Sequence, residues 1–167
     1  MTSEFAFIDA LIARVRAHEG VVRGIGDDGA IVRFAAGEEC VISTDTLVAG
    51  VHFPLDAAPA DIGYKCAAVN LSDLAAMGAT PRFCTLALTM PSLDPGYVDP
   101  LLAGLFALLD SHQVALIGGD TTRGPMSLTL TAIGSVPAGS ALRRDGARAG
   151  DAVYVSGTLG DAAAALA

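Results

Sequence analysis

Five aspartates lie in four short segments that are rich in glycine, serine and threonine. The segments are Gly24–Gly29 (GIGDDG), Ser43–Thr46 (STDT), Asn70–Leu74 (NLSDL) and Gly118–Gly124 (GGDTTRG). Each places a carboxylate beside small hydrogen-bonding residues, and this chemistry suits hard divalent cations and, through them, the phosphates of a nucleotide. No lysine-bearing phosphate loop of the type GxxxxGK[ST] accompanies them. The pattern predicts a metal-assisted phosphate site.

Asp73 belongs to a helix that the apolar spacing predicts over residues 61–77. It continues the stripe of Ile62, Cys66 and Val69, so its carboxylate is expected to share a face with buried apolar side chains. An ionised carboxylate in that position requires a cation or several donors. The alternative is a helix that breaks in the three residues before Asp73 and leaves it as an exposed N-terminal cap.

Asp45 and Asp120 each follow a short apolar or β-branched run, so both are expected at the ends of strands. Ligands gather at strand ends in α/β proteins. Gly118 and Gly119 would let the backbone approach a phosphate closely, and Arg123 adds a guanidinium that can reach an anion. Ordinary turn chemistry is the alternative for each of these aspartates, as it is for the Asp27–Asp28 pair.

The sequence lacks the motifs that several other kinds of functional site require. The glycines at 24, 26 and 29 fit the dinucleotide pattern GxGxxG, but residues 30–34 resemble a strand where that site needs a helix. The patterns GxSxG, HExxH and CxxC do not occur in the sequence. His52, taken alone, is a loop histidine of the kind that is more often exposed than functional.

The composition excludes further classes of protein. The chain has 167 residues, 52% of them apolar, and a net charge of −8, which disfavours binding to nucleic acid or anionic membranes. The first residues lack the basic and apolar regions of a signal peptide, so none is expected, and the apolar stretches are shorter than a membrane span. Cys40, Cys66 and Cys84 each lie in an apolar run and are expected to be buried free thiols. We therefore expect a soluble cytoplasmic protein.

The elements that position these residues predict an α/β (α+β) fold with a mixed sheet flanked by helices. The patterns predict helices over 4–18, 61–77 and 94–109, and strands over 30–34, 40–44, 83–90, 114–117, 127–136 and 152–156. The first two strands are expected to pair as a hairpin. The expected organisation is a domain over 1–137 that carries the four aspartate segments, a linker over 138–150 and the start of a truncated second domain over 151–167.

The four aspartate segments, in this order, resemble those of the thiamine-monophosphate kinases, within the aminoimidazole-ribonucleotide-synthetase-like superfamily. Ile42–Phe53 (ISTDTLVAGVHF) and Ala68–Ala79 (AVNLSDLAAMGA) are the most specific stretches, and the resemblance covers nearly the whole chain. The sister synthetase has Gly-Thr-Lys where this chain has Ser43–Thr46.

The resemblance implies ATP-dependent phosphorylation of thiamine monophosphate to thiamine diphosphate. It implies a homodimer whose sheets form a barrel across the interface, with ATP contacts from Gly119, Asp120 and Arg144 and a substrate contact from His52. The implied magnesium ligands are Asp27, Asp28, Ser43, Thr44, Asp45, Asp73 and Asp120. No residue is expected to act as a covalent or acid–base catalyst, since positioning and charge neutralisation dominate phosphoryl transfer.

Two alternatives remain at the level of the sequence. The chain is part of a sister ATP-dependent synthetase, or it is a non-catalytic acidic module that binds divalent ions or a protein partner. Turnover assays with the two substrates distinguish the sister synthetase from the kinase. A lack of nucleotide affinity would indicate the non-catalytic module.

Overall fold

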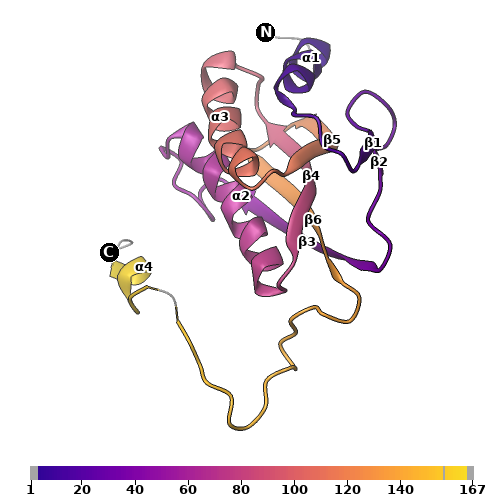
Figure 1. Ribbon diagram of the computed structural model, residues 1–167. Coiled ribbons are helices and arrows are strands. Elements are labelled where there is room, and N and C mark those ends of the chain that lie inside the picture. The colour runs from indigo at the N-terminus through magenta and orange to yellow at the C-terminus, as the bar shows by residue number, and fades with distance from the viewer. Residues whose placement is uncertain (1–3, 156, 165–167) are drawn as a thin grey trace.

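Two long helices cover one face of a four-stranded sheet in the computed structural model, which describes residues 4–155 and 157–164 (Figure 1). Across the sheet the strands run β3 (Glu38–Val48), β6 (Ser127–Pro137), β4 (Thr80–Met90) and β5 (Ala115–Arg123). Strand β6 is antiparallel to both neighbours, whereas β4 and β5 are parallel and joined through a helix. The predicted α/β class with a mixed sheet and flanking helices is confirmed.

The covering helices are α2 (Pro59–Ala76) and α3 (Pro95–Ser111). The remaining elements are α1 (Glu4–Arg14), the short antiparallel pair β1 (Val21–Arg23) and β2 (Ile31–Val32), and α4 (Asp161–Ala164). After β6 the chain follows an exposed, largely irregular path away from the sheet before it reaches α4 (Figure 1). Among the described residues no helix combines the length and the apolarity needed to cross a membrane.

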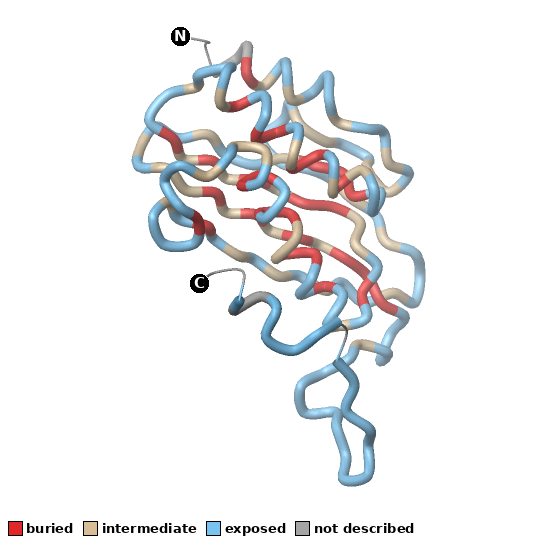
Figure 2. The backbone as a smooth tube through the Cα atoms, turned by 90° about the vertical axis from the view of Figure 1, so that its left-hand side faces the viewer, coloured by how far each residue is buried: buried red, intermediate tan, exposed pale blue. Residues whose placement is uncertain are grey.

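The core lies between the sheet and the two helices. Alternate residues of the central strands point into it, so buried positions recur along each strand (Figure 2). Helices α2 and α3 touch backbone to backbone where they cross. A Cβ atom added at Gly63 would lie 1.9 Å from the carbonyl oxygen of Leu101, and one added at Gly104 would lie 1.9 Å from that of Ala60. Glycine at both positions is therefore what lets the helices approach each other.

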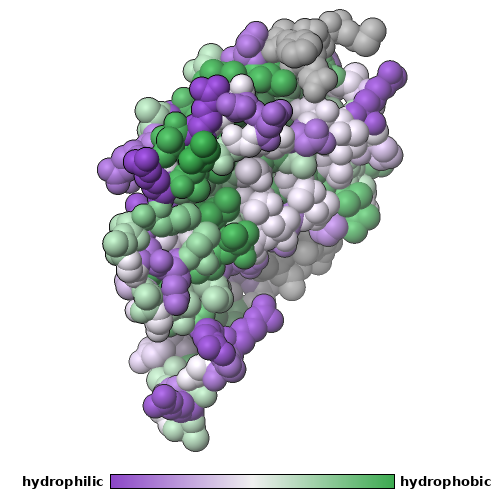
Figure 3. Space-filling model, turned by 90° about the vertical axis from the view of Figure 1, so that its right-hand side faces the viewer, coloured by the Kyte–Doolittle hydropathy of each residue, from purple (hydrophilic) through white to green (hydrophobic). Residues whose placement is uncertain are grey.

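The opposite face of the sheet is covered only in part. A small cluster of Phe83, Ala115 and Ile117 packs there against side chains of the β1–β2 region. Further along the face, hydroxyls pair across the strands, with Oγ1–Oγ1 distances of 2.9 Å for Thr44–Thr131 and 2.8 Å for Thr46–Thr129. Near-neutral and hydrophobic side chains occupy much of the side shown in Figure 3.

The sequence-based elements differ from the structure in their strands. Residues 31–32 pair with β1 rather than with the strand that follows, so the predicted hairpin is wrong. The second strand of that hairpin instead pairs along its whole length with β6. The expected strand over 152–156 does not form in the described part, residues 152–155, and residue 156 lies outside it.

Two further expectations about single residues are corrected. Asp45 and Asp120 lie within strands β3 and β5, not at their ends, because both strands continue for several more paired residues. Cys40 is exposed on strand β3, whereas Cys66 and Cys84 are buried as predicted. The alternation along β3 places Cys40 on its exposed side.

Candidate functional site

Side chains of strand β3 and helix α2 form a line of polar contacts that we term the β3–α2 seam: Ser43, Asp45, Asn70 and Asp73. The Ser43 hydroxyl donates to Asp73 Oδ2 at 2.6 Å, and the backbone N–H of Asp45 donates to Asn70 Oδ1 at 3.1 Å. Helix α2 continues without a break through Asp73, so the alternative of a broken helix is wrong. Asp73 is exposed, so the expectation that its carboxylate shares a face with buried apolar side chains is wrong. The carboxylate lies at the edge of the apolar stripe and accepts from Ser43 of β3.

Asn70 is the buried member of the seam. Its side chain is fully enclosed, and its Nδ2 donates to the carbonyl oxygen of Cys66 at 2.9 Å. Both ends of the amide are thus used, one on the helix and one on the strand. A buried amide with both ends bonded holds β3 at a fixed distance from α2, because leaving either end unpaired is costly.

The charge of Asp45 lies on the helix side of the sheet. Asp45 pairs in register with Leu130, which is completely buried under the helices, and directly opposed residues face the same side. Burial, with the nearby Asp45 carboxylate as a second cause, raises the pKa of the Cys66 thiol to about 12. Asp45 and Asp73 therefore line the same edge, on either side of Asn70.

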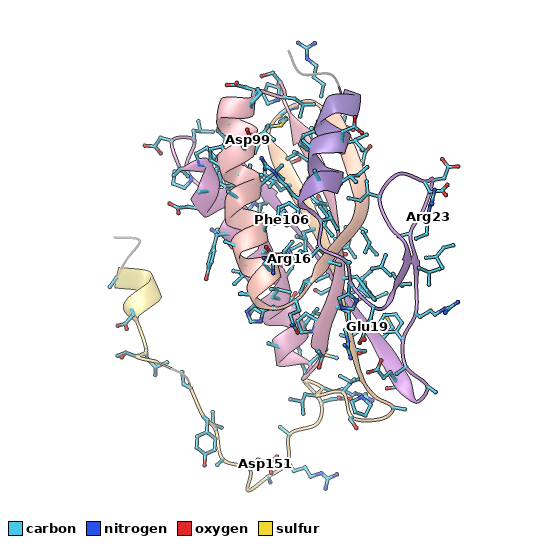
Figure 4. All side chains as sticks on the ribbon, turned by 45° about the horizontal axis from the view of Figure 1, so that its top comes forward. Arg16, Glu19, Arg23, Asp99, Phe106 and Asp151 are labelled. Atoms are coloured by element: carbon cyan, nitrogen blue, oxygen red, sulfur yellow. The ribbon has the colours of Figure 1, made fainter. Side chains whose placement is uncertain are left out.

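A second acidic group lies at the other edge of the sheet, in a cavity of about 780 Å³ that we term the β5-edge pocket. The pocket is open between helix α1, the loop after β1 and strand β5, and its lining includes Asp27, Asp28, Gly119 and Asp120. Thr122 donates its hydroxyl to Asp120 Oδ2 at 2.8 Å. Asp27 is paired with Arg23, at 3.0 Å from Nε to Oδ2, on the loop that also carries Asp28 (Figure 4).

Gly119 brings the backbone of β5 against that of β4. A Cβ atom at this position would lie 1.8 Å from the carbonyl oxygen of Leu86, and its φ of +154° disfavours any other residue. The pairing with β4 also shifts register beside Gly118. Asp120 thus follows an irregular stretch of strand, and its side chain lies on the face opposite α2, level with Thr46 across the sheet.

The seam and the pocket do not meet in one chain. They lie at β3 and β5, the two edges of a four-stranded sheet, and three strand spacings amount to roughly 14 Å. Within residues 4–155 and 157–164, no three His, Cys, Asp or Glu side chains are close enough to hold one metal ion. Thr44 points to the face opposite Asp45, where it bonds Thr131. The predicted ligands therefore form two separate groups, each with hard oxygen donors suited to magnesium.

His52 and Arg144 lie on segments outside the sheet and its helices. The Nδ1 atom of His52 accepts the backbone N–H of Val48 at 3.0 Å, and Lys65 donates from Nζ to the His52 carbonyl oxygen. Arg144 is exposed on the segment that follows β6, beside Arg143, which is paired with Asp145 at 2.7 Å. Asp151, further along this segment, lies well away from the sheet (Figure 4).

A known family of protein domains matches this chain. Residues 26–136 match the family described as AIR synthase related protein, N-terminal domain. The chain belongs to this family.

Two curated relatives that this chain matches are named thiamine-monophosphate kinase. The chain is 54% identical over 165 residues to the thiamine-monophosphate kinase of Salmonella typhimurium, and 53% identical over 165 residues to that of Escherichia coli K12. Each match covers 98% of this chain and 51% of the relative. The chain thus spans about half the length of the curated relatives it matches.

Two of the similar solved structures each cover nearly the whole of this chain. The chain is similar to the thiamine-monophosphate kinase of Stenotrophomonas maltophilia K279a, with a TM-score of 0.88 and 55% identity over 98% of this chain and 52% of the other. It is also similar to a structure described as AaThiL complexed with AMPPCP and TMP, with a TM-score of 0.74 and 32% identity over 98% of this chain and 51% of the other.

Two residues of this domain that organise the site were missed by the sequence analysis. Asn70 was treated as part of a possible break in the helix, yet it is the buried link of the seam. A polar residue one turn before Asp73, on the buried side of the same helix, was the available signal. Lys65 is the only lysine in the sequence, and that rarity was its signal.

Proposed function

We propose that the protein to which this chain belongs transfers a phosphoryl group from ATP to thiamine monophosphate, giving thiamine diphosphate. The observation that carries the proposal is the similarity, across 98% of the chain, to a structure that holds AMPPCP and TMP. The identity of 53–54% to relatives named thiamine-monophosphate kinase supports it further.

The proposal assigns roles to the two acidic groups. In the β5-edge pocket, Gly119 and Asp120 contact ATP, because both residues line the cavity beside Asp27 and Asp28. Arg144 reaches the phosphates from the segment after β6, and His52 contacts the substrate. The magnesium ligands are those named from the sequence: Asp27, Asp28, Ser43, Thr44, Asp45, Asp73 and Asp120. Magnesium would neutralise the charge of the phosphates during in-line transfer.

We further propose that the protein is a homodimer whose two sheets form a barrel. Two features support this part. The face of the sheet that carries Thr44, Thr46, Thr129 and Thr131 has no covering helix among the described residues. The seam and the pocket lie at opposite edges of one sheet, so a second copy offers a way for one copy's seam to approach the other's pocket.

Binding and turnover assays test the proposal. Calorimetry with a non-hydrolysable ATP analogue and magnesium is expected to give binding to the chain, weakened at least tenfold by Asp120→Asn. Asp61, an exposed aspartate in the first turn of α2, serves as the control in the variant Asp61→Asn. A chain without nucleotide affinity contradicts the proposal and favours the non-catalytic module. Turnover of formylglycinamidine ribonucleotide but not thiamine monophosphate by the whole protein favours the sister synthetase.

A further inference from the structure

Lys65 is the only lysine among the ten basic side chains of the sequence. It lies exposed on helix α2, and its Nζ donates to the backbone carbonyl oxygen of His52. The ammonium group carries three donors and a compact charge, so its bond to a carbonyl oxygen is charge-assisted. A long side chain that could move freely in solvent is thus engaged on the turn that carries the proposed substrate contact.

The turn is tied at several points. The backbone N–H groups of Val51 and His52 both donate to the carbonyl oxygen of Val48, at 3.1 and 2.9 Å. Gly50, with a φ of +75°, donates to the carbonyl oxygen of Phe53 at 2.9 Å, and Phe53 is itself buried in the core. Lys65 adds a link from this turn to helix α2.

The orientation of the His52 ring follows from the same turn. Its Nδ1 accepts the Val48 N–H at 3.0 Å, so in the neutral ring the proton is on Nε2. His52 is exposed, so Nε2 is left as a donor toward solvent or a bound anion. Any movement of the His52 backbone changes the distance from Nδ1 to the Val48 amide and with it the direction of Nε2–H.

Helix α2 is a firm base for this link. Gly63, two residues before Lys65, touches the backbone of α3, and Cys66, one residue after it, is completely buried. The position of Lys65 is therefore fixed by the core rather than by the surface. We propose that Lys65 is a positioning residue, which fixes the His52 turn through the His52 carbonyl oxygen and so orients the imidazole toward the substrate phosphate. The proposal rests on the proposed function, in which His52 contacts the substrate.

The test compares Lys65→Met, Lys65→Arg and Arg33→Met in the whole protein to which the chain belongs. Arg33 is exposed next to β2, so its replacement removes the same charge from another part of the molecule. The measured quantities are the hydrogen exchange of the Val48 amide, the ¹⁵N shifts of the His52 ring, and the affinities for thiamine monophosphate and for AMPPCP with magnesium.

In Lys65→Met we expect Val48 amide exchange to rise about tenfold and the affinity for thiamine monophosphate to fall about tenfold, with the AMPPCP affinity unchanged. Lys65→Arg is expected to stay within about threefold of the unsubstituted protein, because a guanidinium also donates to a carbonyl oxygen. Arg33→Met is expected to change neither the exchange of the Val48 amide nor the affinity for thiamine monophosphate.

Unchanged exchange and unchanged ring shifts in Lys65→Met overturn the proposal, as does an equal loss of both affinities, which indicates a general structural role. If the unsubstituted whole protein binds no thiamine monophosphate, the proposed function fails. The amide exchange and the ring shifts still decide whether Lys65 fixes the turn.

Discussion

The two edges of the sheet hold their aspartates in different ways. At the β3 edge, Asp73 accepts from Ser43 and Asp45 is tied by its backbone to Asn70, so the strand and α2 hold each other in place. At the β5 edge, Asp27, Asp28 and Asp120 line an open pocket, and two of them come from a loop. The β3–α2 seam therefore depends on how α2 packs, whereas Asp27 and Asp28 of the β5-edge pocket depend on the loop that carries them. Changes to the core should act on the first and leave the second nearly unaffected.

The largest effect is expected from Gly63→Ala, which attacks the base of the seam. The new methyl group would lie 1.9 Å from the carbonyl oxygen of Leu101. Relief of this clash requires helix α2 or α3 to shift as a whole, which costs packing free energy. We expect the free energy of unfolding to fall by about 3 kcal/mol or more, measured by urea denaturation. Gly29→Ala is the control at the pocket, since a Cβ there meets nothing within 4 Å. Equal losses in the two variants would contradict the comparison.

Asn70→Ala is expected to have the next largest effect. It leaves the Asp45 N–H and the Cys66 carbonyl without their side-chain partner, and the free energy of unfolding should fall by about 2 kcal/mol. Ser72→Ala, on the exposed side of the same helix, is the matched control and should change it by less than about 0.5 kcal/mol. A stable Asn70→Ala variant would show that the seam does not need its buried link.

Asp120→Asn separates stability from binding at the pocket. Asp120 is exposed, so the free energy of unfolding of the unliganded chain should change by less than about 0.5 kcal/mol. The rise in melting temperature caused by magnesium and an ATP analogue should be lost, because that rise comes only from ligand bound to the folded state. A thermal melt with and without these ligands measures both. A full ligand-induced rise in the variant would remove Asp120 from the site.

The smallest effect concerns the charge of Asp45 on the Cys66 thiol. Folding raises the pKa of Cys66 from 9.0 to about 12, so the thiol stays neutral in the folded chain while it ionises in the unfolded one. Its contribution to stability is complete below pH 9 and is lost as the pH rises from 9 through 12. Asp45→Asn should lower the pKa of Cys66 and lessen this loss, whereas Asp120→Asn should not. Urea denaturation of both variants at several pH values from 8 to about 10 measures the difference as the loss of the free energy of unfolding.

Local sequence patterns were sufficient to predict the helices and the central strands of the sheet. The predicted helix over 94–109 forms as α3, where Asp94 accepts from the Gly96 N–H at 3.2 Å as the N-cap, and Gly78, with a φ of +69°, ends α2. These signals act over a few residues and do not depend on the rest of the fold. The helical period of α2 likewise placed Asp73 on the side that meets strand β3.

The pairing of the strands could not be predicted from local sequence patterns. Ile31 and Val32 were assigned to the wrong partner, because β-branched runs indicate strands but not which strands pair. Gly118, Gly119 and Asp120 suggested a turn, yet they lie in β5, where close contact with Leu86 requires a glycine. For the same reason the sequence could name the aspartates but could not show that they divide between two edges.

The pairing of β3 has a consequence for how the chain acquires its structure during synthesis. Strand β3 bonds in its sheet only to β6, and Glu38 meets Pro137, about a hundred residues later. Until β6 leaves the ribosome, an eleven-residue strand stays without its neighbour. Such long-range closure slows folding and exposes an edge to other nascent chains. Translation pauses placed before residue 127 should therefore raise aggregation more than pauses placed after residue 137.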